Sequence, residues 1–217
     1  DFRDMAFLEA LLPDSALRRR IAIPDRIRLR GTAGADKGAF SAASTLSTDG
    51  GEIALQGRLD TRSEAYGIEL RCDSFPLNSF LPADSLGLLD LALQAGGSGF
   101  DPLRAQTRGN IRLQVDRAEF RGRDFGGVKL NANLEGGQLS GRLSDRDEAL
   151  RLLLLISGTL TERKQEVRLT GNVFDFALAE LGIAPQKIGG SFALEAGASA
   201  SDAGSYTARI ALESIEV

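Results

Sequence analysis

The sequence DLALQAGGSG at residues 90–99 returns about a hundred residues later as SFALEAGASA at residues 191–200. In both stretches apolar side chains occupy every second position before the chain passes into small residues. A strand that buries one face has this period of two, because successive side chains point to opposite sides of a sheet. The two stretches therefore predict two strands of the same design, each with one apolar face.

The same alternation extends over most of the chain. In EIALQGRL, residues 52–59, the apolar side chains of Ile53, Leu55 and Leu59 alternate with polar ones. Gly-rich turn sequences such as STDGG, residues 47–51, separate the alternating segments. Short alternating strands joined by tight turns are typical of antiparallel hairpins. Six further segments have the pattern: residues 66–72, 110–120, 127–136, 138–143, 166–174 and 206–215.

The repeated phrases belong to a longer repeat. Ile68 and Val167 are 99 positions apart, whereas Leu91 and Phe192 are 101 apart, so we expect an insertion of two residues between them. Each copy is predicted to contain a strand, a short helix that begins with Phe, a loop and a second strand. The expected helices are FPLNSFL at residues 75–81 and FDFALAELG at residues 174–182.

These patterns predict a mainly β fold, an elongated and curled antiparallel sheet (a β-taco or open-barrel-like groove) built from repeated strand units with short capping helices. One such unit cannot bury its apolar face alone, so its neighbours must cover it. We expect one array over residues 1–217, with a weak first repeat at 1–62, a second at 63–162 and a partial third at 163–217. Because the chain begins with Asp1 and not Met, we expect a fragment of a longer protein.

One stretch departs from the alternation. Residues 150–156, LRLLLLI, are apolar at consecutive positions from Leu152 onward. A strand with apolar side chains on both faces is typical of a sheet that is covered on both sides. We expect this strand to be covered in that way, or to contact a helix or a second subunit.

Composition weighs against catalysis and against nucleic-acid binding. The chain has no His, which removes the commonest general base and most transition-metal sites. With 26 basic and 30 acidic residues its net charge is −4, so no strong positive field attracts nucleic acid. The densest acidic group, SDRDEA at residues 144–149, lacks the spacing of a calcium loop and is interpreted as a solvated hairpin tip. We expect no catalytic residues, no metal and no cofactor.

Arginines and aromatic residues each have a structural and a functional interpretation. The arginines could bind lipid headgroups, but Arg28 and Arg30 alternate with apolar residues as an outward strand face does. The phenylalanines are expected to pack in the core, with contact to an acyl chain as the alternative. Cys72 is in phase with Ile68 and Leu70, so a buried thiol is expected. The arginines are residues 18–20, Arg26, Arg28 and Arg30, and the phenylalanines are Phe75, Phe80, Phe174 and Phe176.

Three long segments carry a resemblance to a known family. They are YGIELRCDSFPLNSFLPADSLGLLDLALQAGGSGFDP (66–102), FGGVKLNANLEGGQLSGRLSDRDEALRLLLLISGTL (125–160) and VRLTGNVFDFALAELGI (167–183). Their succession of strands and loops resembles the repetitive periplasmic region of TamB-like proteins (translocation and assembly module) of the Bacteroidetes type, within the AsmA-like superfamily.

The resemblance implies a long β-rich envelope protein that is anchored in the inner membrane by an N-terminal helix. Such a protein has a trough with an apolar inside and serves phospholipid transport toward the outer membrane or outer-membrane protein assembly. This chain would be an interior, periplasmic segment. Any contact with an outer-membrane assembly barrel would use parts of the parent chain outside the segment.

Each CH₂ of an acyl chain that is left exposed to water costs ~0.8 kcal/mol of free energy, so transport through water needs a continuous apolar lane. Phospholipid acyl chains are therefore the expected partner, and nucleic acid is not. Two alternatives remain: a closed β-sandwich that serves as a structural or interaction module, and, ranked last, a carboxylate-based hydrolase of envelope glycans. The residues expected to line the lane are Ile53, Leu55, Ile68, Leu70, Leu113, Leu130, Leu152, Leu169 and Leu194.

Overall fold

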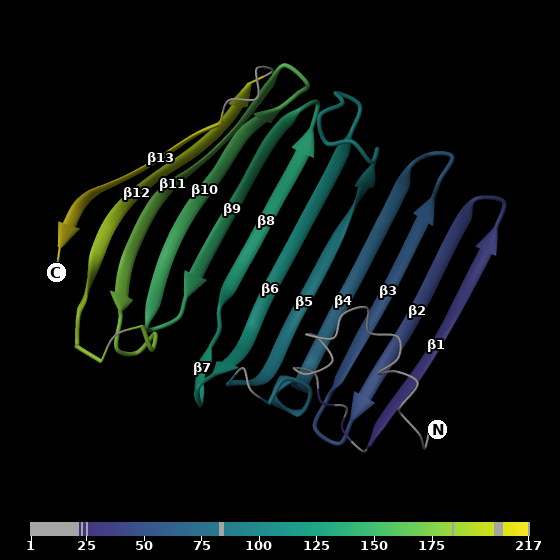
Figure 1. The fold of residues 1–217 in the computed structure, drawn as a ribbon, viewed down its shortest axis with the longest axis horizontal. Coiled ribbons are helices and arrows are strands. Elements are labelled where there is room, and N and C mark those ends of the chain that lie inside the picture. The colour runs from purple at the N-terminus through teal and green to yellow at the C-terminus, as the bar shows by residue number, and fades with distance from the viewer. Residues whose placement is uncertain are drawn as a thin grey trace.

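The chain forms one antiparallel sheet in which each strand pairs with its neighbours along the sequence (Figure 1). The computed structural model describes residues 22, 24, 26–82, 85–183, 185–201 and 206–216. The sheet has 13 strands and is curled without closing into a barrel, which confirms the predicted fold class. Its two edges are β1 and β13, and the short strand β7 pairs only with β6.

The strands are long enough to carry four or more residues on each face, apart from β7. They are β1 (Ile27–Asp36), β2 (Ala39–Thr48), β3 (Glu52–Asp60), β4 (Ala65–Pro76), β5 (Leu86–Ser98), β6 (Arg108–Phe120), β7 (Arg123–Phe125), β8 (Val128–Glu135), β9 (Gln138–Arg146), β10 (Leu150–Leu160), β11 (Lys164–Ala177), β12 (Gly189–Ser201) and β13 (Tyr206–Glu216). The described strands belong to a single sheet, so they do not form the closed sandwich of the alternative hypothesis.

The two predicted helices are wrong. The first segment continues β4 to Pro76 and then forms only the three-residue 3₁₀ turn η1, Leu77–Ser79. The second continues β11 to Ala177 and then passes into turns. In both places a bulge changes the apolar spacing from two to three, as from Cys72 to Phe75, and a spacing of three imitates one face of a helix.

The two bulges are equivalent positions in two similar hairpins. Pairing of β4 with β5 shifts between Cys72 and Phe75, and pairing of β11 with β12 shifts between Val173 and Phe176. Val173 and Phe176 of the second hairpin lie 101 positions after Cys72 and Phe75 of the first. The spacing is therefore 101 throughout, and the expected insertion after a spacing of 99 is not needed. The division of the chain into three repeats stays a prediction, and much of the first repeat lies outside the described residues.

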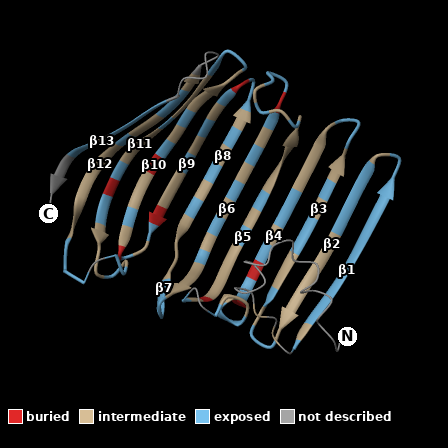
Figure 2. Cartoon of the chain, in the orientation of Figure 1, coloured by how far each residue is buried: buried red, intermediate tan, exposed pale blue. Residues whose placement is uncertain are grey.

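Little of the molecule is buried. The accessible surface is 14348 Å², whereas a compact monomer of 23.1 kDa exposes about 9,700 Å². Figure 2 shows the buried residues as a few separate bands on a sheet that is otherwise half-buried or exposed. Among the described residues the buried apolar side chains are Cys72, Phe75, Ala149, Leu154 and Val173, and none of these residues is completely covered. The sheet is thus a single layer without one continuous core.

The apolar strand β10 is only partly covered. Leu154 is buried, but Leu155, which points to the opposite face, is 53% exposed. Its neighbours across the sheet are Arg142 and Thr170, and no described helix covers it. The expectation that this strand is covered on both faces is therefore wrong for the described part of the chain, whereas contact with a second subunit stays a prediction.

Gly97 of β5 is required by close backbone approach. A Cβ atom at this position would lie 2.1 Å from the carbonyl oxygen of Arg108 on β6. At Gly57 of β3 the nearest atom to such a Cβ, the carbonyl oxygen of Gly67, is 4.0 Å away. Gly97 pairs with Tyr66 of β4, which pairs with Leu59 of β3, and Leu59 lies two positions after Gly57. Both glycines therefore lie on the same face of the sheet.

We therefore expect Gly97→Ala to lower the free energy of unfolding by about 1–3 kcal/mol, because β5 and β6 must separate to admit the methyl group. Gly57→Ala, the matched control, is expected to be neutral or to stabilise by up to about 1 kcal/mol. Urea unfolding followed by circular dichroism measures both. Equal effects at the two positions would contradict the β5–β6 register.

Candidate functional site

The most extended feature of the sheet is a row of leucines on one face. Residues that pair directly across antiparallel strands point to the same side of the sheet. Following these pairs from β3 to β10 gives seven successive leucines, here called the leucine row: Leu55, Leu70, Leu93, Leu113, Leu130, Leu143 and Leu154. The row continues through Gly171 of β11 to Leu194 of β12 and Leu212 of β13.

Rows on either side of the leucine row are also apolar. One contains Ile53 and Cys72, and crosses Val115 and Val128 before it reaches Leu152. The other joins Ile68, Ala95, Ile111, Ala132, Gly141, Ile156 and Leu169. We call these three rows together the apolar face. Apolar residues of one strand pair with apolar residues of the next, so the face extends from β3 to β12.

All nine residues predicted to line the lane lie on the apolar face. Leu55, Leu70, Leu113 and Leu130 belong to the leucine row, and Leu194 lies on its continuation. The other four, Ile53, Ile68, Leu152 and Leu169, lie in the flanking rows. None of the nine is buried: Leu55 is 38% exposed, Ile68 is 40% exposed and the others are half-buried.

Several members of the apolar face are not among the nine predicted lining residues. Leu93, Leu143 and Leu154 are central to the leucine row, and Ile111 and Ile156 lie beside it. The same period of two marks them in the sequence. Their alignment with the other residues depends on the register between strands, which no single segment contains.

The apolar face reaches both edges of the sheet. On β1, Leu29 is 49% exposed, and on β13, Ile210 is 74% and Leu212 is 50% exposed. Arg28 and Arg30 lie on the opposite side of β1 from Leu29 and are exposed, as expected for an outward strand face. Arg26 pairs with Asp49 at 3.5 Å. Residues 18–20 lie outside the described residues.

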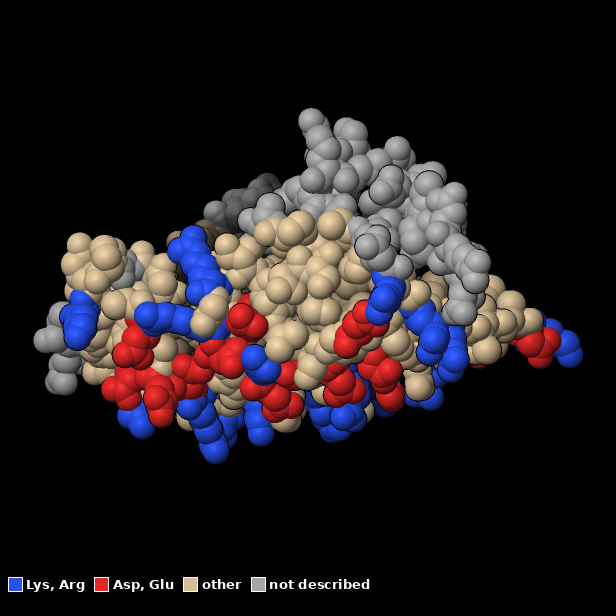
Figure 3. Space-filling model, turned by 90° about the horizontal axis from the view of Figure 1, so that it is seen from below, with Lys and Arg blue, Asp and Glu red and all other residues tan. Residues whose placement is uncertain are grey.

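The opposite face is polar and carries most of the charge. Figure 3 shows acidic and basic side chains gathered along one side of the sheet. Ion pairs join neighbouring charges there, such as Arg117 with Asp124 at 3.0 Å and Lys164 with Glu166 at 2.7 Å. The hydrogen bond and charge of Lys164 lower the pKa of the Glu166 carboxyl. The sheet therefore has one aqueous and one apolar face.

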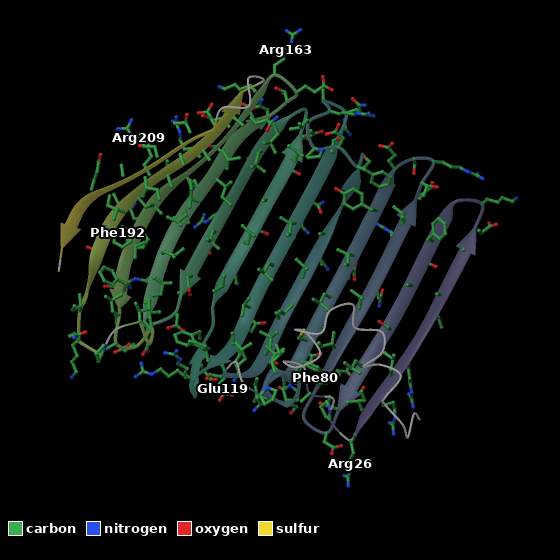
Figure 4. The ribbon with its side chains drawn as sticks, viewed as in Figure 1. Arg26, Phe80, Glu119, Arg163, Phe192 and Arg209 are labelled. Carbon is green, nitrogen blue, oxygen red and sulfur yellow. The ribbon has the colours of Figure 1, made fainter. Side chains whose placement is uncertain are left out.

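Aromatic residues close two corners of the apolar face. Phe75 is buried and stacks on Phe80, with 5.0 Å between the ring centres. Phe176 meets the edge of Phe192 at 5.8 Å at the equivalent place in the second hairpin, and Figure 4 labels Phe80 and Phe192. Phe174, in contrast, is 45% exposed, so it is not a core residue.

Cys72 is a buried, unpaired thiol, as its phase in the strand predicts. Burial raises the pKa of the Cys72 thiol, which keeps it protonated at neutral pH. A protonated buried thiol is a poor nucleophile, so Cys72 acts as a small apolar side chain in the row that begins at Ile53.

Asp145 interrupts the apolar face at its edge. It is 7% exposed and precedes Leu152 in the row of Ile53, at the place interpreted as a solvated hairpin tip. Its Oδ1 accepts a hydrogen bond from the backbone N–H of Asp147 at 2.9 Å, and Asp147 accepts bonds from Gly126 and Ala149. The segment is thus an ordered turn. Burial, as the main cause, raises the pKa of the Asp145 carboxyl.

Two searches for other kinds of site gave no candidates within the part of the chain that the structure describes. No group of three or more acidic, His or Cys side chains is close enough to hold a metal ion. No described helix has the length and apolar character needed to cross a bilayer.

Comparison with protein families, with curated proteins and with solved structures finds no match to this chain. The TamB-like resemblance therefore stays a prediction from the sequence, and any function must be argued from the geometry of the two faces.

We expect Asp145→Asn to raise the unfolding midpoint at pH 7, because it removes a carboxylate that must ionise in a buried place while keeping an oxygen for the Asp147 N–H. A raised folded pKa means that the protonated acid stabilises the fold at low pH, and that this stability is lost as pH rises through the folded pKa. The advantage of the variant should therefore vanish below about pH 4.

Thermal unfolding from pH 3 to pH 8 measures the effect, with the exposed Asp36→Asn as the control. A gain from Asp145→Asn that is the same at pH 3 and pH 7 would show that burial of the charge is not its cause.

Proposed function

We propose that this chain provides an apolar sheet surface along which phospholipid acyl chains move through an aqueous compartment. The leucine row is the observation that carries the proposal. Seven leucines in direct register extend over seven strands, or about 29 Å at the usual spacing between strands, which is close to the ~30 Å hydrocarbon core of a bilayer.

Exposure of the row supports a role in binding. A soluble chain normally covers a sheet face of this size with a second layer, because apolar surface left in water costs about 25 cal/mol for each Å². Here six of the seven leucines of the row are half-buried or exposed, and Leu154 is buried. Acyl chains laid across the row would remove this surface from water and would gain the same free energy themselves.

The shape of the row favours movement over tight capture. Leucines at successive strands offer nearly identical contacts, so an acyl chain can shift by one strand without losing contact area. No catalytic group is needed for such a step, and the proposal includes neither a metal nor a cofactor. We place the chain in the periplasm as an interior segment of a TamB-like envelope protein anchored in the inner membrane. There it would serve lipid transport between the membranes or outer-membrane protein assembly.

A second candidate is an interaction module that binds another chain at its sheet edges. The observation that favours it is the pair of long edge strands β1 and β13, which have a neighbour on one side only among the described strands. Open edges add strands from other chains readily. This would include an outer-membrane assembly barrel, reached through the parent protein.

Leu55→Asp and Leu130→Asp are expected to remove bound phospholipid from the purified chain, because each places a charge in the leucine row. Leu155→Asp is the matched control: it is the same substitution on the same sheet, at a leucine that is 53% exposed on the opposite face. Native mass spectrometry and lipid extraction measure the lipid carried by each variant. We expect the control to retain most of the bound lipid.

Equal loss of lipid from all three variants would show a general effect of charge and not a lane. A wild-type chain that carries no lipid after extraction, and takes none from phosphatidylethanolamine vesicles, would contradict the proposal and favour the interaction module.

A further inference from the structure

The polar face contains a hollow of about 610 Å³ over β1 to β6 that the sequence does not predict. Most of its lining residues point away from the apolar face, and Figure 1 shows the adjacent strands that carry them. Its amide and charged side chains are Gln56, Arg58, Glu69, Gln94, Asn110 and Arg112, all of them exposed.

Four of these side chains form a row across the sheet. Gln56 of β3 pairs with Glu69 of β4, which pairs with Gln94 of β5, which pairs with Arg112 of β6. Neighbouring members are therefore one strand spacing apart, ~4.8 Å, and the row is about 14 Å long. A ligand that lies across the strands would meet a hydrogen-bonding side chain at each step.

These side chains have no partners among the described residues. Within the described part of the chain, none of the six forms a hydrogen bond or an ion pair. Some of the charges elsewhere on the same face are paired, as in Arg71 with Asp73 at 3.0 Å and Arg108 with Glu135 at 3.4 Å. The hollow is thus a place where polar groups are collected without being satisfied by one another.

Glycines keep the floor of the hollow low. Gly67 and Gly96 pair with each other between Arg58 on β3 and Asn110 on β6. A Cβ at Gly96 would lie 3.2 Å from the carbonyl oxygen of Tyr66, and one at Gly67 would lie 2.9 Å from Nε of Arg58. The absence of side chains at these two positions leaves a trough beside the row of Gln56.

We propose that this hollow binds a neutral oligosaccharide chain laid across β3 to β6. Amide, carboxylate and guanidinium groups together donate to and accept from hydroxyl groups, which also both donate and accept. Glu69 at the centre of the row opposes an anionic ligand, and the two arginines oppose a cationic one. The row presents one hydrogen-bonding side chain per strand, ~4.8 Å apart, to hydroxyl groups spaced along an extended glycan.

The test is titration of the whole purified chain with chitotetraose and with maltotetraose. Isothermal calorimetry and NMR of the backbone amides measure the binding. We expect saturable binding of at least one of them, with shifts confined to β3–β6. Gln56→Ala/Gln94→Ala should weaken it about tenfold, because two hydrogen bonds are lost. The control Gln138→Ala/Asn172→Ala removes two exposed amides of β9 and β11 that neither line the hollow nor pair with its residues, and should leave binding unchanged.

Three results would overturn the proposal: no saturable binding of either sugar, equal weakening by the two double variants, or binding of inorganic phosphate that is lost in Arg58→Ala/Arg112→Ala and weakened by salt. The last would make the hollow an anion site. All of these substitutions replace exposed side chains, so unchanged unfolding midpoints verify that the variants fold. The lipid proposal concerns the opposite face, so either proposal can fail without the other.

Discussion

Register between strands is the constraint on which the rest of the structure depends. A slip of one residue at any pairing would move every apolar side chain of that strand to the wrong face. The register holds from β1 to β13, so that Leu29 at one edge and Leu212 at the other lie on the same side of the sheet. Both bulges preserve this result, since the chain resumes with Phe75 and Phe176 paired to β5 and β12.

A single layer places unusual demands on stability. Each strand contacts mainly the strands before and after it, so the structure behaves as a linear array whose stability adds up from one pairing to the next. Backbone hydrogen bonds and same-face neighbours supply the stability that a second layer gives other proteins. The two aromatic corners, Phe75 with Phe80 and Phe176 with Phe192, are where the layer thickens into small cores.

The two faces divide the chemistry of the molecule. The apolar face offers repeated, nearly identical leucines, which suit a ligand that slides and has no direction of its own. On the polar face ion pairs join several of the charges, and six exposed amide and charged side chains without a partner among the described residues line one hollow. An envelope protein that carried acyl chains on one face and held a glycan on the other would use both sides of the same strands.

The sequence by itself determined the strand class and the identity of the apolar face. The period of two is local, so each segment shows which residues share a side, and all nine residues chosen in that way lie on one face. The same local reasoning failed at residues 75–81 and 174–182, where a bulge gives helical spacing to a strand. It also failed at Asp145, whose burial comes from its strand neighbours. Only the tertiary structure decided that the leucines align in one row, that the sheet stays open and that Gln56, Glu69, Gln94 and Arg112 lie side by side. These properties depend on pairing between residues distant in the chain, and no periodicity within one segment encodes that pairing.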